Sequence, residues 1–230
     1  MKTIGLIGGM SWESSAHYYR LINQGVRDRL GSPHSARLLL SSLDFAGIAA
    51  LQHEGRWDRL EAMMTSEARR LEAAGAGAIL LCTNTMHRMA DAIAAGIGVP
   101  FLHIADPAGA ALRRDGHRRA GLLGTAFTME QPFFRERRKR HFGLEIEVPE
   151  AEERAEVHRI IYEELVNGQI EPGSRAIYRR IMAGLAERGA EAIIFGCTEI
   201  MLLVGRADSP VPVYDTTALH AAAAVDWMLG

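Results

Sequence analysis

The feature that most constrains the fold of this chain is a pattern that occurs twice. Each anchor of the first half recurs in the second, about 115 residues later: Gly5–Gly8 as Gly121–Gly124, Cys82 as Cys197, and Val99-Pro100 as Val211-Pro212. Three anchors in the same order predict an internal duplication. We therefore expect two α/β lobes that are related by a pseudo-two-fold axis.

Each half alternates short apolar segments with longer amphipathic ones. Strands that are apolar throughout, separated by helices, are typical of a parallel sheet with helices on both faces. We expect a four-stranded parallel sheet in each lobe. The expected strands are 3–9, 36–43, 76–82, 99–102, 120–124, 144–148, 190–196 and 211–214. The expected helices are one capped by Ser11 or Ser14, then 56–74, 86–95, 133–140, 152–166, 174–188 and one from 218.

The expected division places 1–105 and 214–230 in the first lobe and 106–213 in the second. Ligands of open parallel sheets bind beyond the carboxyl ends of the strands. Because Cys82 and Cys197 both fall at such strand ends, we expect the active site in the cleft between the lobes.

Composition excludes several classes of function. The 230 residues carry a net charge of −2, which gives no general attraction to nucleic acid or to anionic lipid. The apolar start, Met1–Met10, is too short for a signal peptide, and the C-terminus is too short for a membrane span. We expect an intracellular, cytoplasmic protein. Its two cysteines, the only ones in the chain, are then expected to be free thiols.

Two thiols at matched strand ends suit the inversion of a carbon acid. One base must remove the α-proton from one face and one acid must return a proton to the other. A thiol ionises near pH ~8.5, and a helix N-terminus lowers that pKa. Backbone amides after Cys82 and Cys197 would bind a substrate carboxylate. A single buried cysteine is more often a small hydrophobic residue, but the matched pair favours catalysis.

Motifs along almost the whole chain resemble the aspartate/glutamate racemase superfamily, and most closely its broad-specificity amino-acid racemases. The motifs are Gly8–Ser14, Cys82–His87, His103–Asp106, Leu123–Thr125 with Thr128–Glu130, and Phe195–Ile200. The resemblance implies a cofactor-independent amino-acid racemase, often a homodimer, with Cys82 and Cys197 as alternate acid and base. It also implies a set of substrate-binding residues: Met10, Gln52, Thr83, Asn84, Thr85, Thr198 and Glu199.

Two departures bear on the substrate. Aspartate-specific relatives carry an arginine where this chain has Ser42–Ile48, and a lysine where it has Asn167–Gln169. Without either cation, aspartate is a less suitable substrate. A side chain with a neutral polar tip fits better, and Gln52 would read it through hydrogen bonds.

The sequence argues against other cofactors and sites. Pyridoxal phosphate needs a Schiff-base lysine, and Lys2 and Lys139 are the only lysines. No histidines have metal-ligand spacing, so no metal site is expected. The Gly5–Gly9 segment is interpreted as a tight turn near a small substrate, and the basic run Arg135–His141 as a solvated helix end.

The sequence leaves alternatives for the roles of His87 and Glu199 and for the function of the protein. His87 would tune the pKa of Cys82 or be a satisfied core histidine. Glu199 would orient the substrate ammonium group, polarise Cys197 or simply begin a helix. The alternatives in function are a hydantoin racemase or maleate-type isomerase, and a two-lobed small-ligand binder with inert cysteines.

Overall fold

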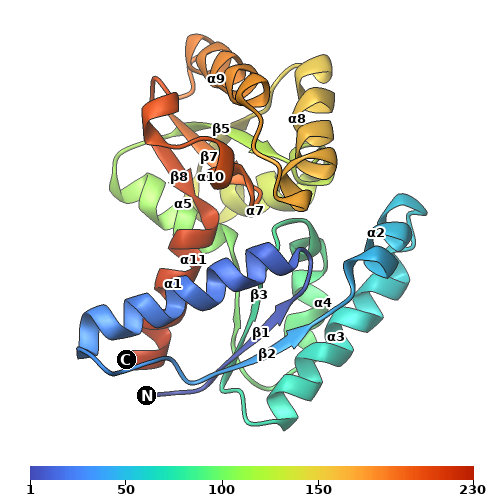
Figure 1. Ribbon diagram of the computed structural model, residues 1–230, viewed down its shortest axis with the longest axis vertical. Coiled ribbons are helices and arrows are strands. Elements are labelled where there is room, and N and C mark those ends of the chain that lie inside the picture. The colour runs from blue at the N-terminus through green and yellow to red at the C-terminus, as the bar shows by residue number, and fades with distance from the viewer. The chain divides into compact units, whose positions relative to one another are not determined.

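A computed structural model describes all residues from Met1 to Gly230, and these divide into two compact units (Figure 1). Unit 1 comprises Met1–His103 and His220–Gly230, and unit 2 comprises Ile104–Leu219. The last helix, α11 (Thr216–Leu229), begins in unit 2 and continues into unit 1. None of the helices is both long and apolar enough to cross a membrane.

Unit 1 contains the predicted four-stranded parallel sheet, in the order β2-β1-β3-β4. Its strands are β1 (Ile4–Gly8), β2 (Leu38–Ser42), β3 (Ala78–Leu81) and β4 (Phe101–Leu102). Its helices are α1 (Trp12–Leu30), α2 (Phe45–His53), α3 (Trp57–Ala73), the 3₁₀ helix η1 (Thr85–Met89) and α4 (Ala90–Ala95).

Alternation along β1 distributes its side chains between two apolar clusters, one on each face of the sheet. Ile4 and Leu6 pack with residues of α1 and α11, whereas Ile7 packs with residues of α2 and α3. Successive side chains of a strand point to opposite faces, so a wholly apolar strand needs cover on both. The helices of unit 1 supply this cover (Figure 1).

Unit 2 repeats the plan with a sheet in the order β6-β5-β7-β8, again parallel throughout. Its strands are β5 (Arg119–Gly124), β6 (Glu145–Glu147), β7 (Ala192–Gly196) and β8 (Val213–Asp215). Its helices are α5 (Ala105–Arg114), α6 (Ala126–Glu130), α7 (Pro132–Phe142), α8 (Ala151–Glu163), η2 (Leu165–Asn167), α9 (Pro172–Glu187), α10 (Ile200–Leu203) and η3 (Arg206–Asp208). The predicted α/β class is thus confirmed.

The expected helices do not include α2, α5, α6 or α10, and the residues of α5 show why that helix forms. In α5, Pro107 falls in the first turn, where no intrahelical N–H bond is lost. Gly109 of the same helix is required by packing, because a Cβ there would overlap the ring of Phe142. The single helix expected over 86–95 is in fact a 3₁₀ turn, η1, followed by the short helix α4.

The basic run on α7 is only partly solvated, which corrects the sequence interpretation. Lys139, Arg140 and His141 are exposed, but Arg138 is fully buried, with its guanidinium 4.2 Å from the centre of the Phe134 ring. Burial lowers the pKa of Arg138 to about 9. Residues 134 and 138 lie one turn apart on the core-facing side of the helix. One residue of the charged run therefore faces the core.

The turn after β1 requires glycine. Gly9 has a φ of +87°, and a Cβ there would overlap the carbonyl oxygen of Leu43. Gly75 also has a positive φ, +96°, but a Cβ there would have open space. We expect Gly75→Ala to cost about 1–2 kcal/mol of folding free energy from backbone strain alone. Gly9→Ala should cost clearly more in urea unfolding, and equal costs would contradict this account of the turn.

Candidate active site

Cys82 follows the last residue of β3, at the carboxyl end of the unit 1 sheet. Its amide donates to the carbonyl of Ile7 on β1 at 2.9 Å, so the sheet register continues into the cysteine. Its carbonyl accepts the Ser14 hydroxyl of α1 at 3.1 Å. Ser14 lies in the first turn of α1, and Ser11, one of the two caps that the sequence allowed, caps this helix. The backbone of Cys82 is therefore held by both neighbouring elements.

The three residues after Cys82 form a buried polar turn. Thr83, Asn84 and Thr85 are at most 8% exposed. The His87 ring nitrogen Nδ1 donates to the carbonyl of Thr83 at 2.7 Å, and the His87 amide donates to the carbonyl of Asn84 at 3.1 Å. The turn thus ends as a 3₁₀ helix rather than as the start of a long α-helix.

Met10 and Gln52, the other predicted unit 1 residues, belong to the same end of the sheet. Met10 directly follows the β1 turn and packs in the apolar cluster that contains Met86. Gln52, on α2, is 4% exposed and donates its Nε2 to the Met86 sulfur at 3.2 Å. Met86 lies in η1, directly after Thr85, so its hydrogen bond places Gln52 beside the residues that follow Cys82.

Cys197 follows β7 in unit 2 and has a charged partner. Its thiol donates to Glu199 Oε2 at 2.9 Å, and the Thr198 hydroxyl donates to the same oxygen at 2.7 Å. Glu199 is 3% exposed, although it also precedes the four-residue helix α10. Glu199 therefore both precedes α10 and contacts the thiol; an exposed carboxylate that only begins a helix is excluded by its burial.

The pKa values of both thiols are raised, which contradicts the expectation that a helix N-terminus would lower them. Burial raises the pKa of Cys82. Burial also raises the pKa of Cys197, and the Glu199 carboxylate raises it further. The following helices, η1 and α10, are too short to offset the loss of hydration. Both cysteines are free thiols, as expected.

This burial predicts a pH effect on stability. Unfolded thiols ionise near pH ~8.5, but the folded ones retain their protons, so the folded state binds more protons above that pH. The stabilisation is fully present below pH ~8.5 and falls by up to about 1.4 kcal/mol per pH unit for each thiol above it. Between pH 7.5 and 9.5, we expect the free energy of unfolding of the wild type to fall by about 2–3 kcal/mol more than that of a Cys82→Ala/Cys197→Ala double variant.

Denaturant unfolding of both proteins at the two pH values measures this difference. Arg138, whose pKa is lowered to about 9 by burial, acts with the opposite sign at high pH. It is present in both proteins, so its contribution cancels. Parallel pH profiles of the two proteins would show that the thiols ionise as freely when folded as when unfolded.

Two tyrosines near Cys197 were not found from the sequence. Burial raises the pKa values of Tyr162 on α8 and Tyr178 on α9, and the nearby groups Cys197 and Glu199 raise them further. Both residues lie on helices whose apolar face the sequence predicts. Nothing in that periodicity distinguishes a core tyrosine from one beside a thiol.

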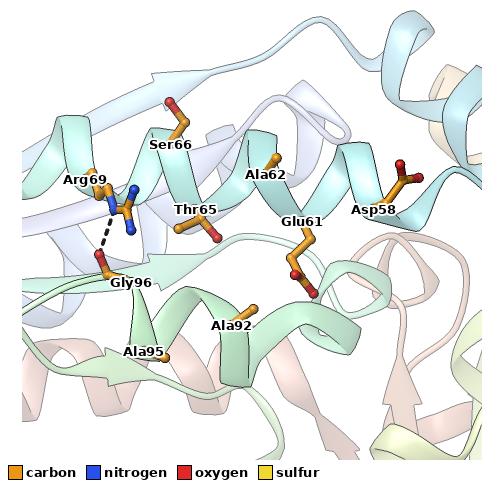
Figure 2. A pocket seen from close by; sticks show the side chains of 9 residues that line it. All are labelled: Asp58, Glu61, Ala62, Thr65, Ser66, Arg69, Ala92, Ala95 and Gly96. Carbon is orange, nitrogen blue, oxygen red and sulfur yellow. Dashed lines mark hydrogen bonds between the residues drawn. The ribbon is translucent and has the colours of Figure 1, made fainter.

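A separate surface hollow of about 490 Å³ lies between α3 and α4 of unit 1 (Figure 2). Arg69 spans it by donating to the carbonyl of Gly96 at 2.8 Å. Its lining contains no thiol and none of the predicted site residues: Asp58, Glu61, Ala62, Thr65, Ser66, Arg69, Ala92, Ala95 and Gly96. It is therefore distinct from the cysteine turns. No group of three or more His, Cys, Asp or Glu side chains is placed to hold a metal ion.

Comparison with known proteins identifies the family. Residues 7–224 match the model of the family described as Asp/Glu/Hydantoin racemase. The structure of a candidate Asp/Glu racemase from Yersinia pestis is 50% identical, with a TM-score of 0.93 and full coverage of both chains. An aspartate racemase homologue from Pyrococcus horikoshii OT3 is 31% identical, with a TM-score of 0.87 and again full coverage.

The fold extends to more distant proteins. A glutamate racemase from Francisella tularensis, solved with D-glutamate, is 12% identical with a TM-score of 0.66; the match covers 99% of this chain and 81% of that one. At that identity the likeness concerns the fold alone. The family match over nearly the whole chain is decisive, and this chain belongs to the Asp/Glu/hydantoin racemase family.

Proposed function

We propose that this protein is a cofactor-independent amino-acid racemase in which Cys82 and Cys197 act on opposite faces of the α-carbon. One observation carries the proposal: each unit presents one buried free thiol directly after a central strand of its sheet. In each unit, small polar residues follow that thiol, at Thr83–Thr85 and at Thr198 and Glu199. The family match is consistent with this chemistry.

The reaction requires two coupled proton transfers. One cysteine, as thiolate, takes the α-proton, and the electron pair of the C–H bond moves into the substrate carboxylate. The second cysteine, as thiol, then donates its proton to the opposite face of the α-carbon. Backbone amides at Thr83–Thr85 are proposed to bind that carboxylate, so they stabilise the charge as it develops. The cycle ends with the two cysteines in exchanged protonation states, and solvent restores them.

Glu199 is proposed to receive the Cys197 proton when that cysteine works as the base. A thiol whose pKa is raised by burial needs a nearby acceptor before it can act. The hydrogen bond from Cys197 to Glu199, at 2.9 Å, already aligns this transfer. Thr198 donates to the same carboxylate oxygen and keeps it oriented.

The proposed substrate carries a neutral polar side chain. At the first position where relatives have a cation, Asp44 caps α2 by accepting the amide of Ala46 at 3.2 Å. In the second such region, the side-chain amide of Asn167 donates to the carbonyl of Glu163, the last residue of α8, at 3.1 Å. Gln52 remains as the proposed reader of the side chain, with its amide oriented by Met86.

Incubation of the purified protein with single L-amino acids tests the proposal. The panel is aspartate, glutamate, homoserine, methionine and lysine, followed by chiral chromatography of the product. We expect the D enantiomer to appear fastest with homoserine, the compound of the panel with a neutral polar side chain. A 5-substituted hydantoin is included because the family description names hydantoin racemases. Racemisation of the hydantoin alone would replace this proposal, and binding without racemisation of any compound would reject it.

A further inference from the structure

Three buried histidines gather beside the Cys82 turn in unit 1. His87, His103 and His220 are at most 7% exposed. The His87 ring lies 4.6 Å from the ring of His103 and 5.8 Å from that of His220, measured between centroids. Buried rings in such contact are rigidly placed, so their hydrogen bonds can fix the backbone that accepts them.

The acceptors determine where the ring protons are. A carbonyl oxygen can only accept, so His87 Nδ1, 2.7 Å from the Thr83 carbonyl, carries a hydrogen. Likewise His220 Nε2 donates to the carbonyl of Leu102 at 2.8 Å. Neutral His220 then accepts the Tyr18 hydroxyl at its Nδ1, at 3.0 Å. In their neutral forms, His87 is thus the Nδ1–H tautomer and His220 the Nε2–H tautomer.

Three successive carbonyls of the Cys82 turn are each held by a donor. Ser14 donates to the carbonyl of Cys82, the His87 ring to that of Thr83, and the His87 amide to that of Asn84. In a trans peptide the N–H points away from the C=O of the same plane, and these peptides are trans. Each anchored carbonyl therefore directs the amide of the following residue: Thr83, Asn84 and Thr85.

We propose that His87 is a positioning residue for this turn. It acts through the Thr83 carbonyl, as the Nδ1–H tautomer, to aim the Asn84 amide at the substrate carboxylate and to keep Cys82 in register. This inference rests on the proposed function, because it gives the amides of the turn their role. His87 itself need not touch substrate.

Two substitutions separate the hydrogen bond from the packing of the ring. His87→Asn places an amide nitrogen on Cγ, where His87 has Nδ1, and so retains the donor. His87→Leu fills much of the space of the ring but provides no hydrogen-bond donor to the Thr83 carbonyl. We expect His87→Leu to lower kcat/KM by about 10- to 100-fold, with KM raised as the carboxylate amides lose alignment. His87→Asn should stay within about threefold of wild type, the range of ordinary context effects.

Tyr18→Phe is the matched control. It removes the hydroxyl that bonds to His220 and leaves the bond to the Cys82 turn in place. We expect little change in kcat/KM, even if the melting temperature falls. Equal losses in His87→Asn and His87→Leu would overturn the proposal, since packing alone would then explain them. Wild-type kinetics in a folded His87→Leu variant would overturn it as well.

A measurement without substrate keeps this proposal separate from the proposed function. In the ¹⁵N NMR spectrum of histidine-labelled protein, the His87 signal is assigned by its loss in His87→Asn. We expect a protonated Nδ1 and a non-protonated Nε2. The reverse tautomer would overturn the inference even if the enzyme racemises amino acids. Absence of racemisation in wild type would reject the function and leave the tautomer result standing.

Discussion

Cys82→Ala and Cys197→Ala are each expected to lower kcat/KM for racemisation by about 10³-fold or more. One thiol must remove the α-proton and the other must return one, so neither substitution leaves a complete pathway. Positioned acid–base groups contribute about 10²- to 10⁴-fold each. Enantiomers have equal free energy, so kcat/KM must fall equally in both directions. Chiral chromatography of reactions started from each enantiomer measures both values.

The serine variants at the same positions control for packing. Cys82→Ser and Cys197→Ser nearly preserve side-chain volume but replace the thiol with a far weaker acid. Like the alanine variants, they should be inactive, with thermal unfolding that shows an intact fold. Retention of more than about a tenth of the activity in any single variant lies outside the range expected for a lost acid or base. Such a result would exclude the two-thiol mechanism.

Glu199→Gln is expected to have the next largest effect, a loss of about 10²-fold in kcat. Glutamine preserves the shape of the side chain but cannot accept the Cys197 proton. The substitution also removes a negative charge, so the pKa of Cys197 should fall, because the Glu199 carboxylate now raises it. A slower enzyme whose Cys197 ionises more readily is therefore the expected combination.

Glu199 could accept the Cys197 proton or only suppress ionisation of that thiol. These two roles predict opposite changes in kcat for Glu199→Gln, so the experiment distinguishes them. If the carboxylate only suppressed ionisation of Cys197, Glu199→Gln would raise kcat near neutral pH. Glu164→Gln serves as the control, because Glu164 lies in the same unit but forms an ion pair with Arg159 and accepts a hydrogen bond from the Ser174 hydroxyl. A gain in kcat from Glu199→Gln would contradict the proposed proton transfer.

The sequence predicts a parallel sheet in each half and places each thiol after a strand, because apolar segments alternate with helical ones and recur at matched positions. The order of the strands within each sheet comes from the structure. A short apolar segment such as Ala78–Leu81 could also be part of a buried helix. Its length and its match to Ala192–Gly196 favour a strand in both halves.

Helix α5 was not predicted because its proline and glycine resemble helix breakers. Pro107 is accommodated in the first turn, and Gly109 is explained by its packing against Phe142 of α7. Arg138 was missed because a charged run does not reveal which residue faces the core.

The electrostatics of the site could be determined only from the three-dimensional structure. Spacing alone places Glu199 near Cys197, but it does not show that the thiol donates to that carboxylate or that both are buried. Burial reversed the expected direction of both thiol pKa values, since desolvation depends on every surrounding element. The bond from His87 to Thr83 likewise depends on a 3₁₀ turn that the periodicity did not predict.

Deuterium distribution during a single reaction tests the central claim most directly. Wild-type protein in D₂O is given the best L substrate of the panel, and both enantiomers are isolated at low conversion. With two thiols on opposite faces, the D product should carry solvent deuterium at the α-carbon, while the remaining L substrate stays largely protiated. A D product that retains the substrate's own proton would show that one base serves both faces, and would contradict the account.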